Sequence, residues 1–161
     1  RVWVTIDREE VLSTAKEREE EARQGKSRGL LHGVPVGLKD IFYTAGMKTA
    51  AGSKVYADFV PDFDATTVAK IKEAGGIILG KAVTTEFATS DPSPTYNPWN
   101  FEHTPGGSSS GSSVAVASRT VGAGCPGLTN RWVHLPPSGL QRHRGTKGHL
   151  RAHQPLRNGA R

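Results

Sequence analysis

A helical pattern that ends at two glycines and runs into an apolar stretch constrains the fold of this chain most. Residues 65–74 repeat apolar side chains at helical spacing. These apolar residues are Val68, Ile71 and Ala74. Gly75-Gly76 follows, and glycine commonly ends a helix. Residues 77–79 (IIL) are wholly apolar, as in a parallel strand covered on both faces. Helix, glycine stop and buried strand form half of a βαβ unit, so the sequence predicts an α/β fold.

The pattern before this unit predicts two strands and a surface helix. Residues 1–6 alternate apolar and polar side chains, as a short strand does. Asp7, with a glutamate three positions later, is typical of a helix start, so we expect a charged helix over residues 8–24. Residues 30–42 place apolar side chains near a period of two, which predicts a buried strand with bends.

Three further features complete the expected organisation. We expect Asp64 to cap the helix over residues 65–74. Residues 90–107 are rich in proline, asparagine and serine and predict a long loop. Residues 111–120 predict a helix that begins at a Ser/Gly-rich loop.

Composition limits the class of protein. A length of 161 residues suits about one domain, and the mean hydropathy of −0.45 is low for a well-cored chain. The chain begins at Arg1 with no signal-peptide pattern, so we expect it to be a piece of a longer protein. Apolar runs are too short to cross a membrane, and a single cysteine fits a reducing compartment. We therefore expect a cytoplasmic protein.

The net charge of +6 comes from one end of the chain. Residues 125–161 hold seven of the 21 Lys and Arg residues and none of the 15 Asp and Glu residues. Periodicity also disappears there, so we divide the chain into residues 1–124 and a disordered basic tail over residues 125–161. Because the excess positive charge lies at one end, it disfavours nucleic-acid binding as the function of the whole chain. A basic nucleic-acid-binding module formed by the tail remains an alternative.

The loop over residues 105–113 (PGGSSSGSS) gathers several hydroxyl groups in a small volume. Its glycines allow the main chain to approach a substrate closely, and acyl-transfer chemistry is possible if a base lies nearby. A flexible linker or a helix-capping turn is the structural alternative. A phosphate cradle is disfavoured because no Gly-Lys-Ser/Thr follows.

Lys39, in the segment 33–40 (GVPVGLKD), is the candidate base. A lysine can accept a proton only if burial or a neighbouring cation lowers its pKa. Leu38 and Ile41 flank it in an apolar strand, which makes partial burial possible. The alternative is a surface lysine paired with Asp40.

Five segments resemble the amidase signature family in the order in which the family carries them. The first, residues 33–40, is similar to the family's G-x-P-x-x-x-K-D strand. The others are residues 44–53, residues 64–68 with 79–87, residues 97–100 (NPWN), and residues 105–112. The last resembles the family's P-G-G-S-S-G/S-G-S signature, and the resemblance covers about residues 1–124.

The resemblance implies an amidase-like hydrolase of amide C–N bonds that uses a Ser–cis-Ser–Lys triad. It also implies a mixed sheet covered by helices on both faces, incomplete in this chain. Lys39 matches the triad lysine, and Ser108 matches the bridging serine, which follows a cis peptide. The neighbouring loop residues are Gly106, Gly107, Ser109 and Ser110. The expected substrate is a small-molecule amide, and no cofactor or metal is implied.

The acyl-forming serine of the family is missing from residues 129–137 (TNRWVHLPP), where its Q/D-T-G-G-S-x-x-R-P motif is expected. The codons of this segment, read one base later, can spell that motif. Trp132, for example, has the codon TGG, which becomes GGG for glycine. We therefore predict a frameshift between about residues 122 and 128. As written, the chain lacks its nucleophile and is expected to be inactive.

Other functions remain as alternatives. Within the same fold, the parent protein could be the glutaminase (A) subunit of a tRNA-dependent amidotransferase, which requires partner subunits. Cys125 has no identifiable base partner. A metal site at His143, His149 and His153 is disfavoured because these residues lie in the tail.

Overall fold

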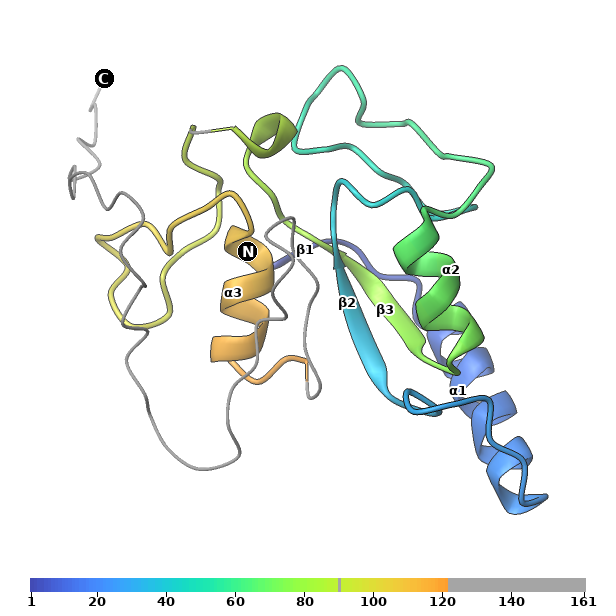
Figure 1. Cartoon of the computed structure of the whole chain (residues 1–161). Helices are drawn as coiled ribbons and strands as arrows, with labels where there is room; N and C mark the ends of the chain where they lie inside the picture. Colours follow the sequence, from blue (N-terminus) through green and yellow to red (C-terminus); the bar gives the residue numbers. More distant parts are fainter. Residues whose placement is uncertain (90, 122–161) are drawn as a thin grey trace.

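The computed structural model describes residues 1–89 and 91–121 (Figure 1). The sequence predictions for residues 125–161, including the basic tail, the frameshift, Cys125 and the three histidines, lie outside the described residues. The elements are β1 (Trp3–Thr5), α1 (Arg8–Arg23), β2 (Pro35–Lys39), α2 (Thr66–Glu73), β3 (Ile77–Ala82), the 3-10 turn η1 (Glu86–Ala88) and α3 (Ser110–Ala117).

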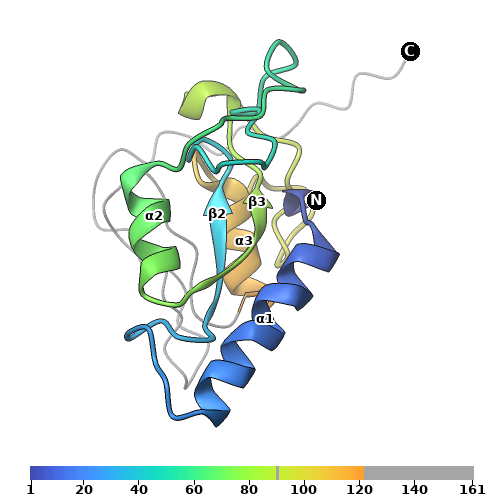
Figure 2. The same cartoon turned by 90° about the vertical axis from the view of Figure 1, so that its right-hand side faces the viewer.

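The three described strands form one mixed sheet in the order β1-β3-β2. β2 runs parallel to β3 and β1 runs antiparallel to it. Helices α1 and α2 lie against one face of the sheet, and α3 lies against the other (Figures 1 and 2). The predicted α/β class and the mixed sheet with helices on both faces are therefore confirmed.

The apolar core lies between β2 and α2. Leu38 is completely buried there, because the strand's inward face meets the apolar side of the helix. The buried residues of this cluster are Val36, Leu38, Val68 and Ile71. On the opposite face, Ala82 of β3 packs with Val116 of α3 and with Trp3. Ile78 and Leu79 are only half-buried, so β3 is less completely covered than its apolar sequence predicts.

Gly111 allows α3 to pack directly on the main chain of the sheet. A Cβ atom at this position would lie 2.4 Å from the Val83 nitrogen and 2.7 Å from the Val2 carbonyl oxygen. No side chain fits within such distances. The Gly111 N–H also donates to the Val83 carbonyl oxygen at 2.9 Å, which fixes the start of the helix against the end of β3.

Two of the three predicted helix-end features are present. The Asp7 side chain accepts a hydrogen bond from the Glu10 N–H and caps α1. The main-chain N–H groups of Gly75 and Gly76 donate to the Lys72 and Ile71 carbonyl oxygens, which is the Schellman pattern that ends α2.

The prediction that Asp64 caps α2 is wrong. The residue at the cap position is Ala65, and no side chain bonds to this helix end. Asp64 lies one residue earlier, where its carboxylate instead accepts hydrogen bonds from the Ala45 N–H and from Lys72. It therefore joins the loop after β2 to the side of α2.

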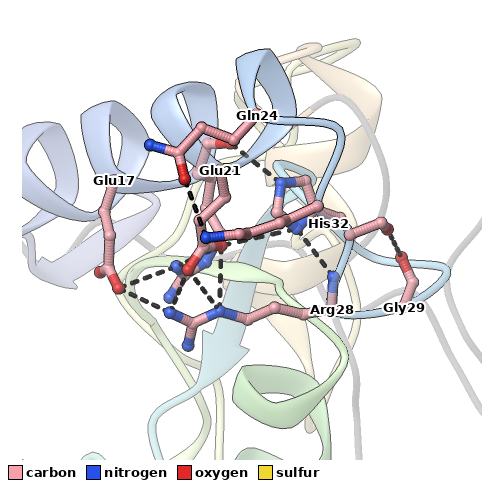
Figure 3. A network of polar contacts seen from close by, with 9 residues as sticks. Glu17, Glu21, Gln24, Arg28, Gly29 and His32 are labelled. Carbon is pink, nitrogen blue, oxygen red and sulfur yellow. Dashed lines mark hydrogen bonds and ion pairs between the residues drawn. The ribbon is translucent and has the colours of Figure 1, made fainter.

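The strand predicted over residues 30–42 is shorter than expected. Residues 31 and 33 donate main-chain hydrogen bonds to the end of α2, at Ala74 and Gly75, so the ladder of β2 begins only at Pro35. Arg28 holds the preceding segment to α1 through ion pairs with Glu17 and Glu21, at 2.6 and 2.5 Å (Figure 3).

No helix within residues 1–89 and 91–121 is both long and apolar enough to cross a membrane.

Replacing Leu38 by alanine tests the core. We expect Leu38→Ala to lower the free energy of unfolding by roughly 2–5 kcal/mol, because it leaves a cavity between β2 and α2. Urea unfolding followed by circular dichroism measures the change. The matched control is Leu30→Ala, because Leu30 is fully exposed and the same truncation there creates no cavity. Equal effects of the two substitutions would contradict the described core.

Candidate functional site

Lys39 and Ser108 meet at the carboxyl end of β2. The Lys39 ammonium nitrogen donates a hydrogen bond to the Ser108 hydroxyl oxygen over 2.7 Å, although the two residues lie 69 positions apart. Lys39 is completely buried, whereas Ser108 is half-buried. The buried amine therefore reaches a partly accessible hydroxyl, an arrangement that permits proton transfer between the two groups.

The main chain of Ser108 is held by the end of the neighbouring strand. Its carbonyl oxygen accepts hydrogen bonds from the Thr85 N–H and from the Thr84 hydroxyl, each at 3.1 Å. The peptide bond from Gly107 to Ser108 is cis. Lys39 pairs with Ala82 in the parallel ladder, so the two threonines lie just beyond the same edge of the sheet. Parallel strands commonly place functional groups at this carboxyl edge.

The other predicted loop residues have different surroundings. Gly106 and Gly107 are exposed, and Gly106 has a left-handed φ of 82°. Ser109 occupies the cap position of α3 without a side-chain cap bond. Ser110 is buried, and its hydroxyl accepts a hydrogen bond from Ser93 at 2.6 Å. The structure thus brings Lys39 and Ser108 together directly, and the neighbouring residues shape the loop.

Burial changes the proton affinity of Lys39. Loss of solvent around the amine lowers the pKa of Lys39 below its ordinary value, because an apolar environment disfavours the charged form. Among the described residues, Lys39 forms no ion pair. The alternative of a surface lysine paired with Asp40 does not hold, because Asp40 faces Lys81 on the other side of β2.

Lys81 and Asp40 form a buried pair that the sequence did not predict. Both side chains are fully buried, and the Lys81 nitrogen lies 3.8 Å from a carboxylate oxygen of Asp40. Lys81 also donates to the Phe42 carbonyl oxygen and to the Thr49 hydroxyl. Burial raises the pKa of Asp40 to about 6 and lowers the pKa of Lys81 to about 8, and each charge partly offsets the shift of the other. No spacing in the sequence indicates this contact.

No group of three or more His, Cys, Asp or Glu side chains that could hold a metal ion occurs in the part of the chain that the structure describes. The polar group that contacts the Lys39 amine is the Ser108 hydroxyl.

The chain belongs to the amidase family, whose sequence model, named Amidase, matches residues 1–125. It is 46% identical over 142 residues to the A subunit of the glutamyl-tRNA(Gln) amidotransferase of Geobacter metallireducens, covering 84% of this chain and 29% of that protein. The corresponding protein of Myxococcus xanthus is 42% identical over 127 residues, covering 75% of this chain and 26% of the relative. The chain thus spans less than a third of the length of these curated relatives.

Solved structures give the same assignment. Native peptide amidase from Stenotrophomonas maltophilia has a TM-score of 0.68 and 38% identity, covering 74% of this chain and 26% of that enzyme. The A subunit of the glutamyl-tRNA(Gln) amidotransferase of Thermotoga maritima has a TM-score of 0.57 and 33% identity, covering 74% of this chain and 31% of that protein. Both similarities concern the same partial fold.

The buried amine of Lys39 should titrate below the ordinary lysine value of about 10.4. We expect this because burial penalises its charged form. NMR titration of ¹³C-labelled lysine side chains measures the midpoint, and loss of the signal in Lys39→Met assigns it. A midpoint at or above the ordinary value would show that the amine is solvated or held charged.

Removing the carboxylate of Asp40 should lower the pKa of Lys81 further. Asp40 favours the charged ammonium, so Asp40→Asn leaves the burial effect unopposed and moves the pKa of Lys81 below about 8. The same titration measures this shift. The exposed Asp62→Asn is the matched control and should leave the midpoint unchanged. An unchanged or raised value in Asp40→Asn would contradict the described pair.

Proposed function

We propose that Lys39 and Ser108 are the base and the proton-relaying hydroxyl of an amide C–N hydrolase that uses a Ser–cis-Ser–Lys triad. The observation that carries this proposal is the 2.7 Å hydrogen bond from a buried lysine to a half-buried serine in a member of the amidase family. The lowered pKa of Lys39 supports it, because a base must be neutral before it can accept a proton.

In the proposed reaction, the neutral amine of Lys39 accepts the hydroxyl proton of Ser108. Ser108 in turn takes the proton of the attacking serine hydroxyl. The attacking oxygen forms a bond to the amide carbonyl carbon, and the C–N bond then breaks. The proton returns through Ser108 to the leaving nitrogen, which departs as an amine or ammonia. Water then attacks the ester by the same relay and releases the acid.

The attacking serine lies outside the described residues in this proposal. The match to the family ends at residue 125. We propose that a frameshift after about residue 122 replaces the segment that carries the nucleophile and the oxyanion-binding N–H groups. The nucleotide sequence of codons 118–135 tests this directly, because an inserted or deleted base must be present.

We expect the 161-residue chain to show no measurable amidase turnover, because it lacks the nucleophile. A gene with the reading frame restored and extended should encode an active enzyme. In that enzyme, Lys39→Met and Ser108→Ala should each lower kcat by at least about 100-fold, since proton transfer typically contributes that much. Ammonia release from a panel of small amides measures the rate.

The matched control for the lysine substitution is Lys54→Met, because Lys54 is exposed. It should retain the activity of the restored enzyme. The proposed loss of the nucleophile would be overturned if the 161-residue chain hydrolysed an amide and the Lys39→Met substitution abolished that activity. Full activity of the restored Lys39→Met enzyme would overturn the role of Lys39.

A second candidate is the glutaminase (A) subunit of a tRNA-dependent amidotransferase, which would use glutamine as its amide. The identity of 46% to the Geobacter metallireducens protein favours this candidate. Such a protein works with partner subunits. Affinity purification of the restored protein from its own organism distinguishes the two, because a stoichiometric second subunit is expected only for the amidotransferase.

A further inference from the structure

The buried amine of Lys81 binds the turn that directly follows Lys39. Lys39 is the last residue of β2, so the main-chain path over residues 39–42 helps to determine where its side chain points. In this turn the N–H groups of Ile41 and Phe42 donate to the Lys39 carbonyl oxygen, at 2.8 and 3.1 Å. The Phe42 carbonyl oxygen in turn accepts a hydrogen bond from the Lys81 amine. Lys81 therefore reaches the main chain of the candidate base through a single intervening residue.

The same amine joins the turn to the loop that follows it. Lys81 donates to the Thr49 hydroxyl at 2.6 Å, and that hydroxyl donates onward to the Met47 carbonyl oxygen at 3.2 Å. The Asp40 carboxylate lies 3.8 Å from the amine. The Ala51 N–H donates to the Asp40 carbonyl oxygen at 2.9 Å, which ties the loop to the turn a second time. The Lys81 amine thus connects the turn and the loop at one buried point.

The strand ladder places the two lysines on opposite faces of the sheet. Lys81 pairs with Leu38, on the face that α2 covers, whereas Lys39 pairs with Ala82, which packs against α3. The lowered pKa of Lys39 has burial as its cause. The hydrogen bonds of Lys81 therefore act on Lys39 through the main chain of the turn, from the far side of the strand.

Stability alone does not account for a charged pair at this place. Replacing a buried ion pair by apolar side chains of similar volume is often neutral or stabilising. Burial raises the pKa of Asp40 to about 6 and lowers the pKa of Lys81 to about 8, so it opposes the charged form of each side chain. An apolar pair, however, offers no donor to the Phe42 carbonyl oxygen and the Thr49 hydroxyl. The distinctive contribution of Lys81 is thus the geometry of the turn.

We propose that Lys81 is a positioning residue, whose amine fixes the turn after β2 and thereby holds the Lys39 amine against the Ser108 hydroxyl. Asp40 is the counter-charge beside that amine. The inference rests on the proposed function, which assigns the proton relay to Lys39 and Ser108 and gives no role to Lys81. Such a relay depends on placement, because a displacement of about 1 Å can cost about 100-fold in rate.

The test measures the interaction of Lys39 with Ser108 in the presence and in the absence of the Lys81 amine. In the 161-residue chain, Ser108→Ala removes the acceptor of the Lys39 ammonium, so we expect it to lower the pKa of Lys39 further. NMR titration of ¹³C-labelled lysine side chains measures this change. In the Lys81→Met background, Ser108→Ala should change the midpoint much less, because the Lys39 amine is no longer held against the hydroxyl. Comparing the two differences cancels the direct effect of the lost Lys81 charge.

Two further variants separate positioning from a loss of the fold. Thr49→Val removes one acceptor of Lys81 and keeps both charges, so it should weaken the effect of Ser108→Ala in part. Lys81→Met combined with Asp40→Asn leaves no unpaired buried carboxylate and should reproduce the result of Lys81→Met alone. Circular dichroism of each variant confirms that its fold is retained.

The matched control is Ile77→Ala, which truncates a buried residue at the amino end of β3, opposite Pro35 and away from the turn. It should lower the free energy of unfolding and keep the full effect of Ser108→Ala on Lys39. In the restored enzyme, Lys81→Met should lower kcat by about 10- to 100-fold and change KM little, because the lost contact serves the proton relay.

An equal effect of Ser108→Ala in the parent and Lys81→Met chains would overturn the positioning role, and so would an unchanged kcat in the restored Lys81→Met enzyme. An absent effect of Ser108→Ala in the parent chain would also overturn it, since there would be no contact to hold. Failure of the proposed function gives a different result. Full activity of the restored Lys39→Met enzyme would refute the catalytic role of Lys39, while a reduced Ser108→Ala effect in Lys81→Met would still show that Lys81 holds the Lys39–Ser108 contact.

Discussion

The hydrogen bonds from Thr84 and Thr85 to the Ser108 carbonyl oxygen hold the Gly/Ser loop against the sheet. Both threonines are buried, so these bonds are shielded from water. The parallel pairing of β2 with β3 determines where they lie relative to Lys39. A change of register between the two strands would move the threonines away from the lysine and would separate Lys39 from Ser108. The geometry of the site is therefore a property of the strand pair.

The sheet also carries two buried lysines with different surroundings. Lys81 pairs with Leu38 across the ladder, whereas Lys39 pairs with Ala82, so the two lysines project from opposite faces. Lys81 has a carboxylate, a carbonyl and a hydroxyl near its amine. The Lys39 amine has the Ser108 hydroxyl as its hydrogen-bond partner. At Lys81 the Asp40 carboxylate opposes part of the effect of burial on the pKa, whereas burial lowers the pKa of Lys39 without an opposing charge. The Lys81 contact to Phe42 also holds the turn that follows Lys39.

The sequence predicted the elements whose signals are local. The glycine stop of α2 and the Asp7 cap of α1 depend on residues within one helical turn, and both are present. The cap at Asp64 was wrong because its carboxylate has a partner in a distant loop, at Ala45. The strand predicted before Lys39 is longer than the observed one because residues 31–33 bond to the end of α2, a segment far along the chain, and bend away from the ladder.

The residues alone predicted Lys39 as a candidate base and the loop over residues 105–113 as a source of hydroxyl groups. The assignment of Ser108 as the partner of Lys39 came from the family resemblance, since no local pattern joins residues 69 positions apart. The Lys81–Asp40 pair was not predicted, because it forms only when two separate segments meet.

Ion pairs join α1 to the segment that follows it. Arg28 binds Glu17 and Glu21 on the helix, and its hydrogen bond lowers the pKa of Glu21 (Figure 3). Arg28 and Glu17 remain accessible to solvent, so dissolved salt screens their attraction. The core between β2 and α2 is apolar and does not share this sensitivity. High ionic strength would therefore weaken the link between α1 and the segment around Arg28 before it disturbs the sheet that carries Lys39.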